Sequence, residues 1–332
     1  MAKPIAVLIS DVHYNLSTLD LADKATNMAI DKANQLKVPL IVAGDLHDTK
    51  ANLRGECVNK MLTTFSKSQD CMILRGNHDQ INEKSSEHSL NFLGHLPKVL
   101  IIDNVFIFKD INLIPYQHDP KQFESILNSI PKGALIIMHQ GVVGAGMGDY
   151  MQDHSAIDIS LLSDYRVISG HYHTRQTIKT GRPRKGAIGA LDYIGNPYTL
   201  TFGEASDPEK GFQILMDDGT LEFVPTNLRR HIKLEMDTNS TIVDIIPAPT
   251  DLVWIKLEGT KEELLKFNKK DYCIKMGLPD NTKIELIPVD TKNESKVIKS
   301  TSQTDTLDAI IDTLINTTRE QKYRLKQLWR TL

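Results

Sequence analysis

The stretch that decides the fold is IAVLISDVH at residues 5–13, where a short apolar run ends in an aspartate and a histidine. The same arrangement returns as LIVAGDLHD at 40–48 and as CMILRGNHD at 71–79. ALIIMH at 134–139 and RVISGHYH at 166–173 complete the set. Runs this short and this rich in Ile, Val and Leu are typical of buried, mostly parallel strands. Each predicted strand therefore ends in an acidic, amide or imidazole side chain.

Helical segments separate the predicted strands. A stretch at roughly 18–36 carries residues at helical spacing, namely Leu19, Ala22, Ala25, Ala29 and Ala33. A second helical stretch covers roughly 53–67. From 98 to 114, and again from 187 to 224, strand follows strand, with DDG at 217–219 as a hairpin signal. Strands that alternate with helices beside a β-rich layer predict an α/β fold.

The pattern of predicted strands and helices changes near residues 225–250. A small α/β unit follows, with strands at 252–258 and 283–287 and a helix at 260–270 between them. Residues 289–304 are polar and have the composition of a linker. We therefore predict a main domain, a small domain, a linker and a C-terminal helix, at residues 1–228, 229–288, 289–304 and 305–332.

The overall composition is that of an ordinary globular protein. The 332 residues are 40% hydrophobic and 24% charged. No apolar run reaches the roughly 18 residues of a membrane span, and the N-terminus lacks the long apolar region of a signal peptide. The three cysteines have no CxxC spacing, so we expect neither a disulfide framework nor a thiolate zinc site. A reducing cytoplasm is the simplest compartment.

The side chains at the strand ends predict a metal site. Sites in open α/β sheets form beyond the carboxyl ends of the strands, so these residues can converge. Asp11 with His13, and His171 with His173, are two residues apart and can face one ion together. Imidazole, carboxylate and amide donors suit Mn, Fe or Zn. The candidates exceed what one four-coordinate ion needs and fit two ions that share a carboxylate, with Asp45 as the natural bridge. The candidate ligands are Asp11, His13, Asp45, Asn77, His139, His171 and His173.

These five blocks resemble the signature DxH, GDxxD, GNHD, H and GHxH of the calcineurin-like metallophosphoesterases, over roughly residues 5–173. The resemblance implies a β-sandwich flanked by helices, in α/β/β/α layers. It implies two divalent ions, with Mn²⁺ expected and Mg²⁺, Fe²⁺ or Zn²⁺ as alternatives. One ion would be held by Asp11, His13, Asp45 and His173. The other would be held by Asp45, Asn77, His139 and His171.

The same resemblance gives a catalytic role to two further residues. His78 would not bind an ion but would face the phosphate and protonate the leaving oxygen. Asp48 lies three residues after the bridging aspartate. We expect it to pair with His78 and to orient the imidazole ring.

A second set of motifs resembles a narrower group. YIGNPYTLTFGE at 193–204, KGFQIL at 210–215 and LIPY at 113–116 are similar to stretches of SbcD-type nucleases of DNA double-strand-break repair. The resemblance implies a metal-dependent DNA exonuclease and endonuclease. Residues 229–288 would form the DNA-capping domain of that group, and the chain would work as a homodimer within a heterotetramer. The short length resembles phage-encoded members, which would place the protein in the host cytoplasm.

The C-terminal segment, 305–332, is predicted to be an amphipathic helix with a basic flank. Its apolar stripe consists of Leu307, Ile310, Ile311, Leu314, Ile315, Leu325, Leu328 and Trp329. By the same resemblance, it would dock on the coiled coil of an SbcC-like ATPase. The alternative is that it folds back on the main domain.

Any contact with DNA must come from local basic surface, because the net charge of the chain is −3. The segment RQTIKTGRPRKG at 175–186 follows His173 and has no acidic residue. We expect its basic side chains to contact phosphate near the metal site. A solvated hairpin tip is the alternative. The candidate DNA-binding residues are Arg175, Lys179, Arg182, Arg184 and Lys185.

Two rival functions stay open at this point. A phosphodiesterase for small molecules or cyclic nucleotides would use the same ligands, but it would need no cap, detached helix or basic rim. A non-catalytic scaffold that binds DNA ends would need no complete set of ligands, yet every expected ligand and His78 are present. The sequence therefore favours the nuclease.

Overall fold

The computed structural model describes residues 2–50, 52–82, 87–146, 156–180, 189–207, 209–238, 240 and 246–289. The predicted C-terminal helix and all but the first residue of the predicted linker lie outside these ranges. Within the described residues, no helix is long and apolar enough to cross a membrane.

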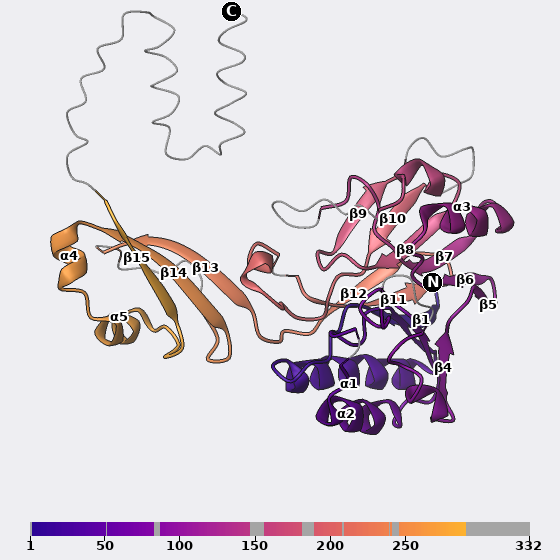
Figure 1. Ribbon diagram of the computed structural model, residues 1–332, viewed down its shortest axis with the longest axis horizontal. Coiled ribbons are helices and arrows are strands. Elements are labelled where there is room, and N and C mark those ends of the chain that lie inside the picture. The colour runs from indigo at the N-terminus through magenta and orange to yellow at the C-terminus, as the bar shows by residue number, and fades with distance from the viewer. Residues whose placement is uncertain are drawn as a thin grey trace, which may run out of the picture. The chain divides into compact units, whose positions relative to one another are not determined.

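Two six-stranded sheets form the main body of the protein (Figure 1). The first has the order β12, β11, β1, β2, β3 and β4, with bounds Leu221–Pro225, Gly211–Met216, Pro4–Ile9, Leu40–Ala43, Cys71–Leu74 and Val99–Ile102. Strands β1 to β4 are parallel, and β11 and β12 join the sheet as an antiparallel hairpin. The hairpin turns at the predicted DDG signal, because β11 ends at Met216 and β12 begins at Leu221.

The second sheet repeats the parallel arrangement. Its order is β5, β6, β7, β8, β10 and β9, with bounds Phe106–Phe108, Ile111–Ile114, Leu135–His139, Arg166–Gly170, Ala190–Tyr193 and Gln176–Lys179. Strands β6, β7, β8 and β10 are parallel, and β5 and β9 are antiparallel edge strands. The five apolar runs of the sequence are thus β1, β2, β3, β7 and β8.

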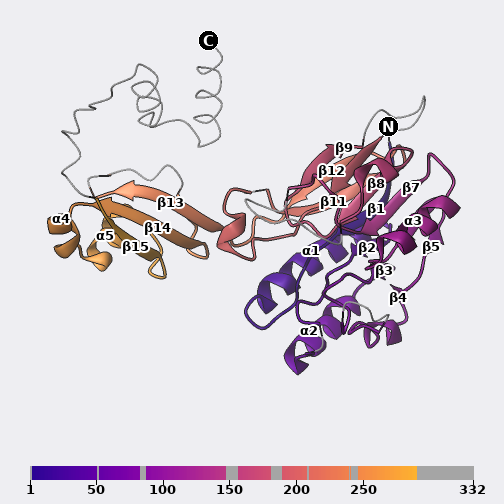
Figure 2. The same cartoon turned by 45° about the horizontal axis from the view of Figure 1, so that its top comes forward.

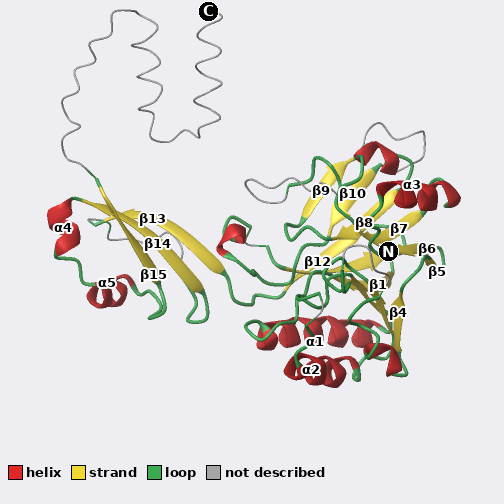
Figure 3. Cartoon of the chain, viewed as in Figure 1, coloured by secondary structure: helices red, strands yellow, loops and turns green. Residues whose placement is uncertain are grey.

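Helices cover the outer faces of both sheets (Figure 3). On the first sheet lie α1 (Leu19–Leu36) and α2 (Gly55–Phe65), which confirm the two predicted helices. On the second lies α3 (Pro120–Ser129), which begins where Asp119 accepts a hydrogen bond from the Lys121 amide and Pro120 takes the first helical position. The layers are therefore α/β/β/α, as predicted.

The period-2 alternation of each strand divides its side chains between two layers of core. In β1, Val7 and Ile9 pack against the helices, whereas Ala6 and Leu8 face the second sheet. Both sheets contribute to the layer between them, which includes Leu8, Ile41, Leu74, Ile137 and Ile168. Near-continuous apolar runs arise because each strand is buried on both faces.

A separate three-stranded sheet follows the sandwich in the sequence (Figure 2). Its order is β13 (His231–Asp237), β14 (Leu252–Gly259) and β15 (Lys283–Pro288). The single helix predicted at 260–270 is wrong, because two short helices stand there, α4 (Lys261–Leu265) and α5 (Lys269–Met276). Each has its own N-cap: Thr260 forms a capping box with Glu263, and the Asn268 side chain accepts from two backbone amides.

The described residues fall into two compact units. The larger takes in 1–236, 240–256 and 268–285, apart from the gaps given above. The smaller takes in 237–239, 257–267 and the residues from 286. The domain boundaries expected at 228 and 288 stay predictions.

The layer between the sheets should dominate the stability of the sandwich. Ile137 on β7 is 0% exposed and Ile107 on β5 is 65% exposed. We expect Ile137→Ala to lower the free energy of unfolding by about 2–5 kcal/mol, because it leaves a cavity between the sheets. The matched Ile107→Ala should change it by less than about 1 kcal/mol. Chemical denaturation of both variants checks this, and equal losses would contradict the assignment of the core.

Candidate metal centre

The parallel strands deliver the candidate ligands to one end of the sandwich. Paired residues near the strand ends, such as Ala43 with Leu74 and His139 with Gly170, show that neighbouring strands end at the same level. The residues that follow therefore emerge side by side. One contact ties the two sheets together here, because His139 Nδ1 donates to the Ala43 carbonyl oxygen at 2.7 Å.

The first cluster contains Asp11, His13 and His173, whose potential ligand atoms all lie within 4.8 Å of one another. The Nε2 atoms of His13 and His173 are 3.2 Å apart. His13 Nε2 is also 3.9 Å from Asp45 Oδ2. Two imidazole nitrogens and a carboxylate thus face one small volume.

The second cluster contains Asp45, His139 and His171 and meets the same 4.8 Å limit. His139 Nε2 lies 3.3 Å from Asp45 Oδ2. Asn77 Oδ1 completes the group, at 3.0 Å from His139 Nε2 and 2.9 Å from His171 Nδ1. Because Asp45 Oδ2 lies near an imidazole of each cluster, its carboxylate is the group that both clusters share.

Contacts outside the clusters orient three of the four imidazole rings. His13 Nδ1 is 3.1 Å from Asp48 Oδ1, and His173 Nδ1 is 3.0 Å from Glu204 Oε1. His139 Nδ1 is bonded to a backbone carbonyl, as described above. Each ring therefore presents Nε2 to the clusters, the arrangement that metal-binding histidines use. His171 is the exception, because it presents Nδ1.

The charges of the centre attract a cation. Burial would raise the pKa of Asp45, but the His139 imidazole, with two further imidazoles nearby, holds that pKa well below its usual range. Burial would lower the pKa of His139, but Asp45 and Asp11 raise it to about 9. The two carboxylates thus favour positive charge at the His139 ring. A divalent cation would supply that positive charge between the same carboxylates.

A second charged network holds His173. Burial would raise the pKa of Glu204, but His173 and the Lys210 ammonium lower it to about 2. Lys210 Nζ lies 3.4 Å from Glu204 Oε2 and donates to the backbone oxygen of His173 at 3.0 Å. Asn196 Nδ2 donates to the same carboxylate at 2.9 Å. Glu204 is therefore an anion fixed between the ring it orients and two donors.

Strained backbone marks the centre. Asp11, His13, Asp45 and His171 have φ angles of 52°, 51°, 51° and 95°. Residues other than glycine rarely adopt positive φ, so these backbone conformations cost free energy. Surrounding contacts maintain them: His171 N, for example, lies 3.1 Å from both carboxylate oxygens of Asp11.

Glycines leave the space in which the ligands sit. A Cβ atom on Gly44 would lie within 3.0 Å of the His139 ring, and one on Gly76 would meet the Asp45 carboxylate. A Cβ on Gly170 would overlap Ser10 Oγ and the Ala43 carbonyl. The ligands, their charges and this cradle fit two divalent ions with nitrogen and oxygen donors. Asp11, His13, Asp45 and His173 would hold one, and Asp45, Asn77, His139 and His171 the other.

His78 and Asp48 lie beside the first cluster, but their contact differs from the expected dyad. His78 Nδ1 is 2.9 Å from the backbone oxygen of Asp48, whereas the Asp48 carboxylate faces His13. The His78 amide donates to Asp45 Oδ1 at 2.8 Å. The ring of His78 lies edge-on to that of His13, with centroids 4.8 Å apart. The backbone oxygen of Asp48 therefore makes the hydrogen bond to His78, while a carboxylate oxygen of Asp48 lies within 4.8 Å of a His78 ring nitrogen.

Two of the five predicted DNA-binding residues, Arg175 and Lys179, fall within the described part of the chain. Arg175 stands two residues after His173, forms an ion pair with Glu209 and lies over the Phe223 ring at 4.5 Å. Lys179 pairs with Ala190 at the end of β10 that is remote from the ligands. The remaining candidates lie outside the described residues, namely Arg182, Arg184 and Lys185.

Sequence reasoning assigned no role to three residues that support the ligands. Glu204 and Lys210 hold His173, and Asn15 Nδ2 donates to Asp48 Oδ2 at 3.1 Å. Glu204 and Lys210 belong to the FGE and KGF motifs, which were the available signal. Asn15 follows the DVH block by two residues, where nothing distinguishes it from a turn residue.

Comparison with known proteins identifies the family. Residues 6–175 match the calcineurin-like phosphoesterases. The chain belongs to the calcineurin-like phosphoesterase family. It is a metallophosphoesterase, and the two Asp and His clusters are its candidate sites for the divalent ions that the family uses.

Individual relatives are distant. The chain is 26% identical over 209 residues to "Exonuclease subunit 1" of Enterobacteria phage T4, a match that covers 57% of this chain and 58% of that protein. Similar solved structures include a nuclease MPE of Pseudomonas putida, with 16% identity, a TM-score of 0.32 and 66% and 87% of the two chains covered. Another is a phosphopantetheinyl hydrolase of Mycobacterium tuberculosis, with 12% identity, a TM-score of 0.36 and 59% and 91% covered.

Glu204 should tune the affinity of this metallophosphoesterase for its ions. We expect Glu204→Gln to weaken Mn²⁺ binding by about 10- to 100-fold, because the amide keeps the size of the side chain but not the charge that makes His173 a better donor. Isothermal titration calorimetry measures the effect. Glu222→Gln on the exposed face of β12 is the control and should bind as the wild type does. Unchanged affinity in Glu204→Gln would show that Glu204 does not act through the ring.

The space left by Gly170 should also determine the affinity of the centre for its ions. We expect Gly170→Ala to reduce Mn²⁺ affinity at least about tenfold, because the new methyl group displaces Ser10 and the strand that carries Ala43. Gly55→Ala is the control, since nothing lies within 4 Å of a Cβ there and the residue begins α2. It should bind ions normally and unfold at the same or a slightly higher temperature. Normal binding by Gly170→Ala would contradict the proposed cradle.

Proposed function

We propose that this chain hydrolyses phosphodiester bonds in DNA, as a Mn²⁺-dependent exonuclease and endonuclease. The observation that carries the proposal is the pair of Asp and His clusters joined through Asp45, with His78 beside them. Nucleic acid as the substrate is supported by the relative named an exonuclease subunit. The FGE and KGF motifs, which resemble those of DNA-repair nucleases, support the same choice.

The ions would supply an activated water and would neutralise the phosphate oxygens in an in-line displacement. The protein supplies the frame. Asp45 and the Asn77 oxygen fix where the donors of the two clusters meet. In His13, His139 and His173, the Nδ1 atom is engaged by a contact outside the clusters. Each ring therefore keeps one orientation, with Nε2 as the atom that can bind an ion.

His78 is placed to move a proton. A carbonyl oxygen only accepts, so the Nδ1 atom that contacts the Asp48 carbonyl carries a hydrogen, and Nε2 is the atom free for substrate. In the imidazolium form, Nε2–H passes its proton to the leaving oxygen as the P–O bond breaks, and the ring becomes neutral. The contact to Asp48 keeps the ring in place before and after the transfer.

The wider assembly rests on the relatives and on the C-terminal sequence. The phage relative is named a subunit, and the apolar stripe of 305–332 suits a coiled-coil surface. We propose that the chain works in the host cytoplasm as a homodimer, together with an SbcC-like ATPase bound by this segment. The small sheet at 231–288 would contact DNA as a cap.

Removal of the His78 ring should separate chemistry from ion binding. We expect His78→Ala to lower the rate of nucleotide release from end-labelled linear duplex DNA at least about 100-fold with Mn²⁺, because the leaving oxygen loses its proton donor. Its Mn²⁺ content should equal that of the wild type. EDTA should abolish the activity of both. His95→Ala, an exposed histidine on the turn at Leu93–His95, is the control and should keep full activity.

Other outcomes would point to the rival functions. Hydrolysis of a small chromogenic phosphodiester with intact DNA would indicate a small-molecule phosphodiesterase, or a nuclease that needs its ATPase. DNA binding without any hydrolysis, unchanged in His78→Ala, would indicate a scaffold.

A further inference from the structure

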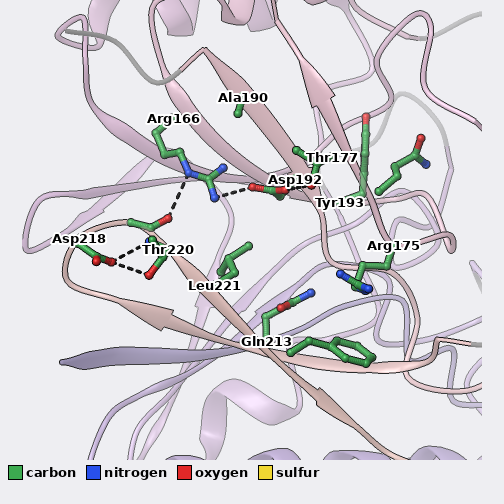
Figure 4. Close-up of a pocket in the computed structure, with 13 residues that line it drawn as sticks. Arg166, Arg175, Thr177, Ala190, Asp192, Tyr193, Gln213, Asp218, Thr220 and Leu221 are labelled. Atoms are coloured by element: carbon green, nitrogen blue, oxygen red, sulfur yellow. Dashed lines mark hydrogen bonds and ion pairs between the residues drawn. The ribbon is translucent and has the colours of Figure 1, made fainter. Parts of the chain in front are cut away.

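A cavity of about 360 Å³ opens at the edge of the sandwich, between β9 and β10 of the second sheet and β11 and β12 of the first (Figure 4). This volume is in the range of small-molecule sites. The core layer between the two sheets contains apolar side chains such as Leu8 and Ile168, and polar side chains join apolar ones in the lining of this cavity. Asp192, Thr177 and Gln213 line the cavity, and Gln213 is paired with Leu8 of the core layer.

At the end of the cavity remote from the candidate metal centre, the charged side chains already form ion pairs and hydrogen bonds with one another. Arg166 Nη2 lies 2.5 Å from Asp192 Oδ2, and Arg166 Nε donates to the Gly219 carbonyl at 3.2 Å. Thr177 Oγ1 donates to the other Asp192 oxygen, and Thr220 donates to Asp218. The positive charge is thus neutralised, and two carboxylates line the wall. Among the described residues that line this end, Arg166 is the cation, and it is already paired with a carboxylate.

The other end holds polar atoms that have no hydrogen-bond partner among the described residues. Gln213 is 3% exposed, and its amide makes no hydrogen bond to any part of the chain that the structure describes. Arg175 Nε is likewise buried without an acceptor. Figure 4 shows Gln213 and Arg175 together at one end of the cavity and Arg166, Asp218 and Thr220 at the other. The Gln213 side chain lines the cavity, so its amide donors and acceptor are available to a ligand with a matching edge.

These groups define the chemistry of the ligand. A carboxamide offers one acceptor and two donors side by side, the set that pairs bidentately with the edge of a nucleobase. The Arg175 guanidinium, backed by the Phe223 ring at 4.5 Å, presents a flat cation, a surface on which bases stack. A purely apolar ligand would leave the Gln213 amide unsatisfied. A flat, uncharged heterocycle with donors and acceptors on its edge matches both groups.

We propose that this cavity is a nucleobase subsite, in which Gln213 and Arg175 hold the base of a nucleotide near the bond to be cleaved. The inference rests on the proposed DNA hydrolysis. Gln213 is paired with Leu8, three residues before Asp11, which corresponds to about 10 Å along the strand. Arg175 follows the ligand His173 by two residues. At the rise of about 3.4 Å per nucleotide in duplex DNA, Gln213 and Arg175 are therefore within a few nucleotides of the ion centre.

The test compares DNA ends that carry or lack a base. End-labelled oligonucleotides are made with normal or abasic residues at the two terminal positions, and KM is measured with Mn²⁺. For the wild type, the abasic ends should raise KM about tenfold, the range of one bidentate base contact. For Gln213→Leu, which keeps the size and burial of the side chain, normal and abasic ends should differ less than about twofold. Thr220→Val, at the remote end of the cavity, is the control and should behave as the wild type.

A second measurement does not depend on hydrolysis. Deoxynucleosides carry no phosphate, so their binding in EDTA reports the cavity and not the ion centre. They should bind the wild type and Thr220→Val, and bind Gln213→Leu at least about tenfold more weakly. An absence of nucleoside binding, or an equal effect of abasic ends in wild type and Gln213→Leu, would overturn the subsite. Nucleoside binding with no DNA cleavage would overturn only the proposed DNA hydrolysis.

Discussion

The structure depends on one buried carboxylate. Asp45 is 2% exposed, and its oxygens contact the backbone of His78 and the ring of His139, with the ring of His13 somewhat further away. A charge so far from water persists only among compensating groups. The imidazoles supply that compensation, and Gly76 leaves the space in which the carboxylate lies. The two sheets must therefore meet so that strands from each can contribute.

Around this carboxylate, one set of residues supplies the ligand atoms and another set orients the ligand side chains. The strand ends supply the donor atoms, while residues on turns decide which nitrogen of each ring faces inward. Glu204 and the Asp48 carboxylate perform that second task for His173 and His13. Asp48 also aims His78 through its backbone oxygen, so one residue organises both an ion ligand and the proposed proton donor. A substitution of the Asp48 side chain would disturb His13 more directly than His78.

The sequence predicts the parts that follow a repeating physical rule. Strands buried on both faces give continuous apolar runs, so β1, β2, β3, β7 and β8 and the residues after them could be located. The contact of Asp48 with His78 was expected, but through the carboxylate, because spacing along the chain cannot distinguish a side-chain oxygen from a backbone one. The role of Glu204 was not predicted, because this residue lies on a short turn that approaches His173 only in the folded chain. Two N-caps, Thr260 and Asn268, were overlooked where a single helix was predicted.

The contacts of the centre also join distant parts of the chain. His13 and His173 are 160 positions apart, and His139 and Ala43 are 96 apart. Contacts of such separation form late, after the loops between them have closed. During synthesis the ribosome must therefore release the chain well past His173 before either ion site can exist. The nascent protein consequently has no phosphoesterase chemistry until the residues on both sides of these contacts have been synthesised.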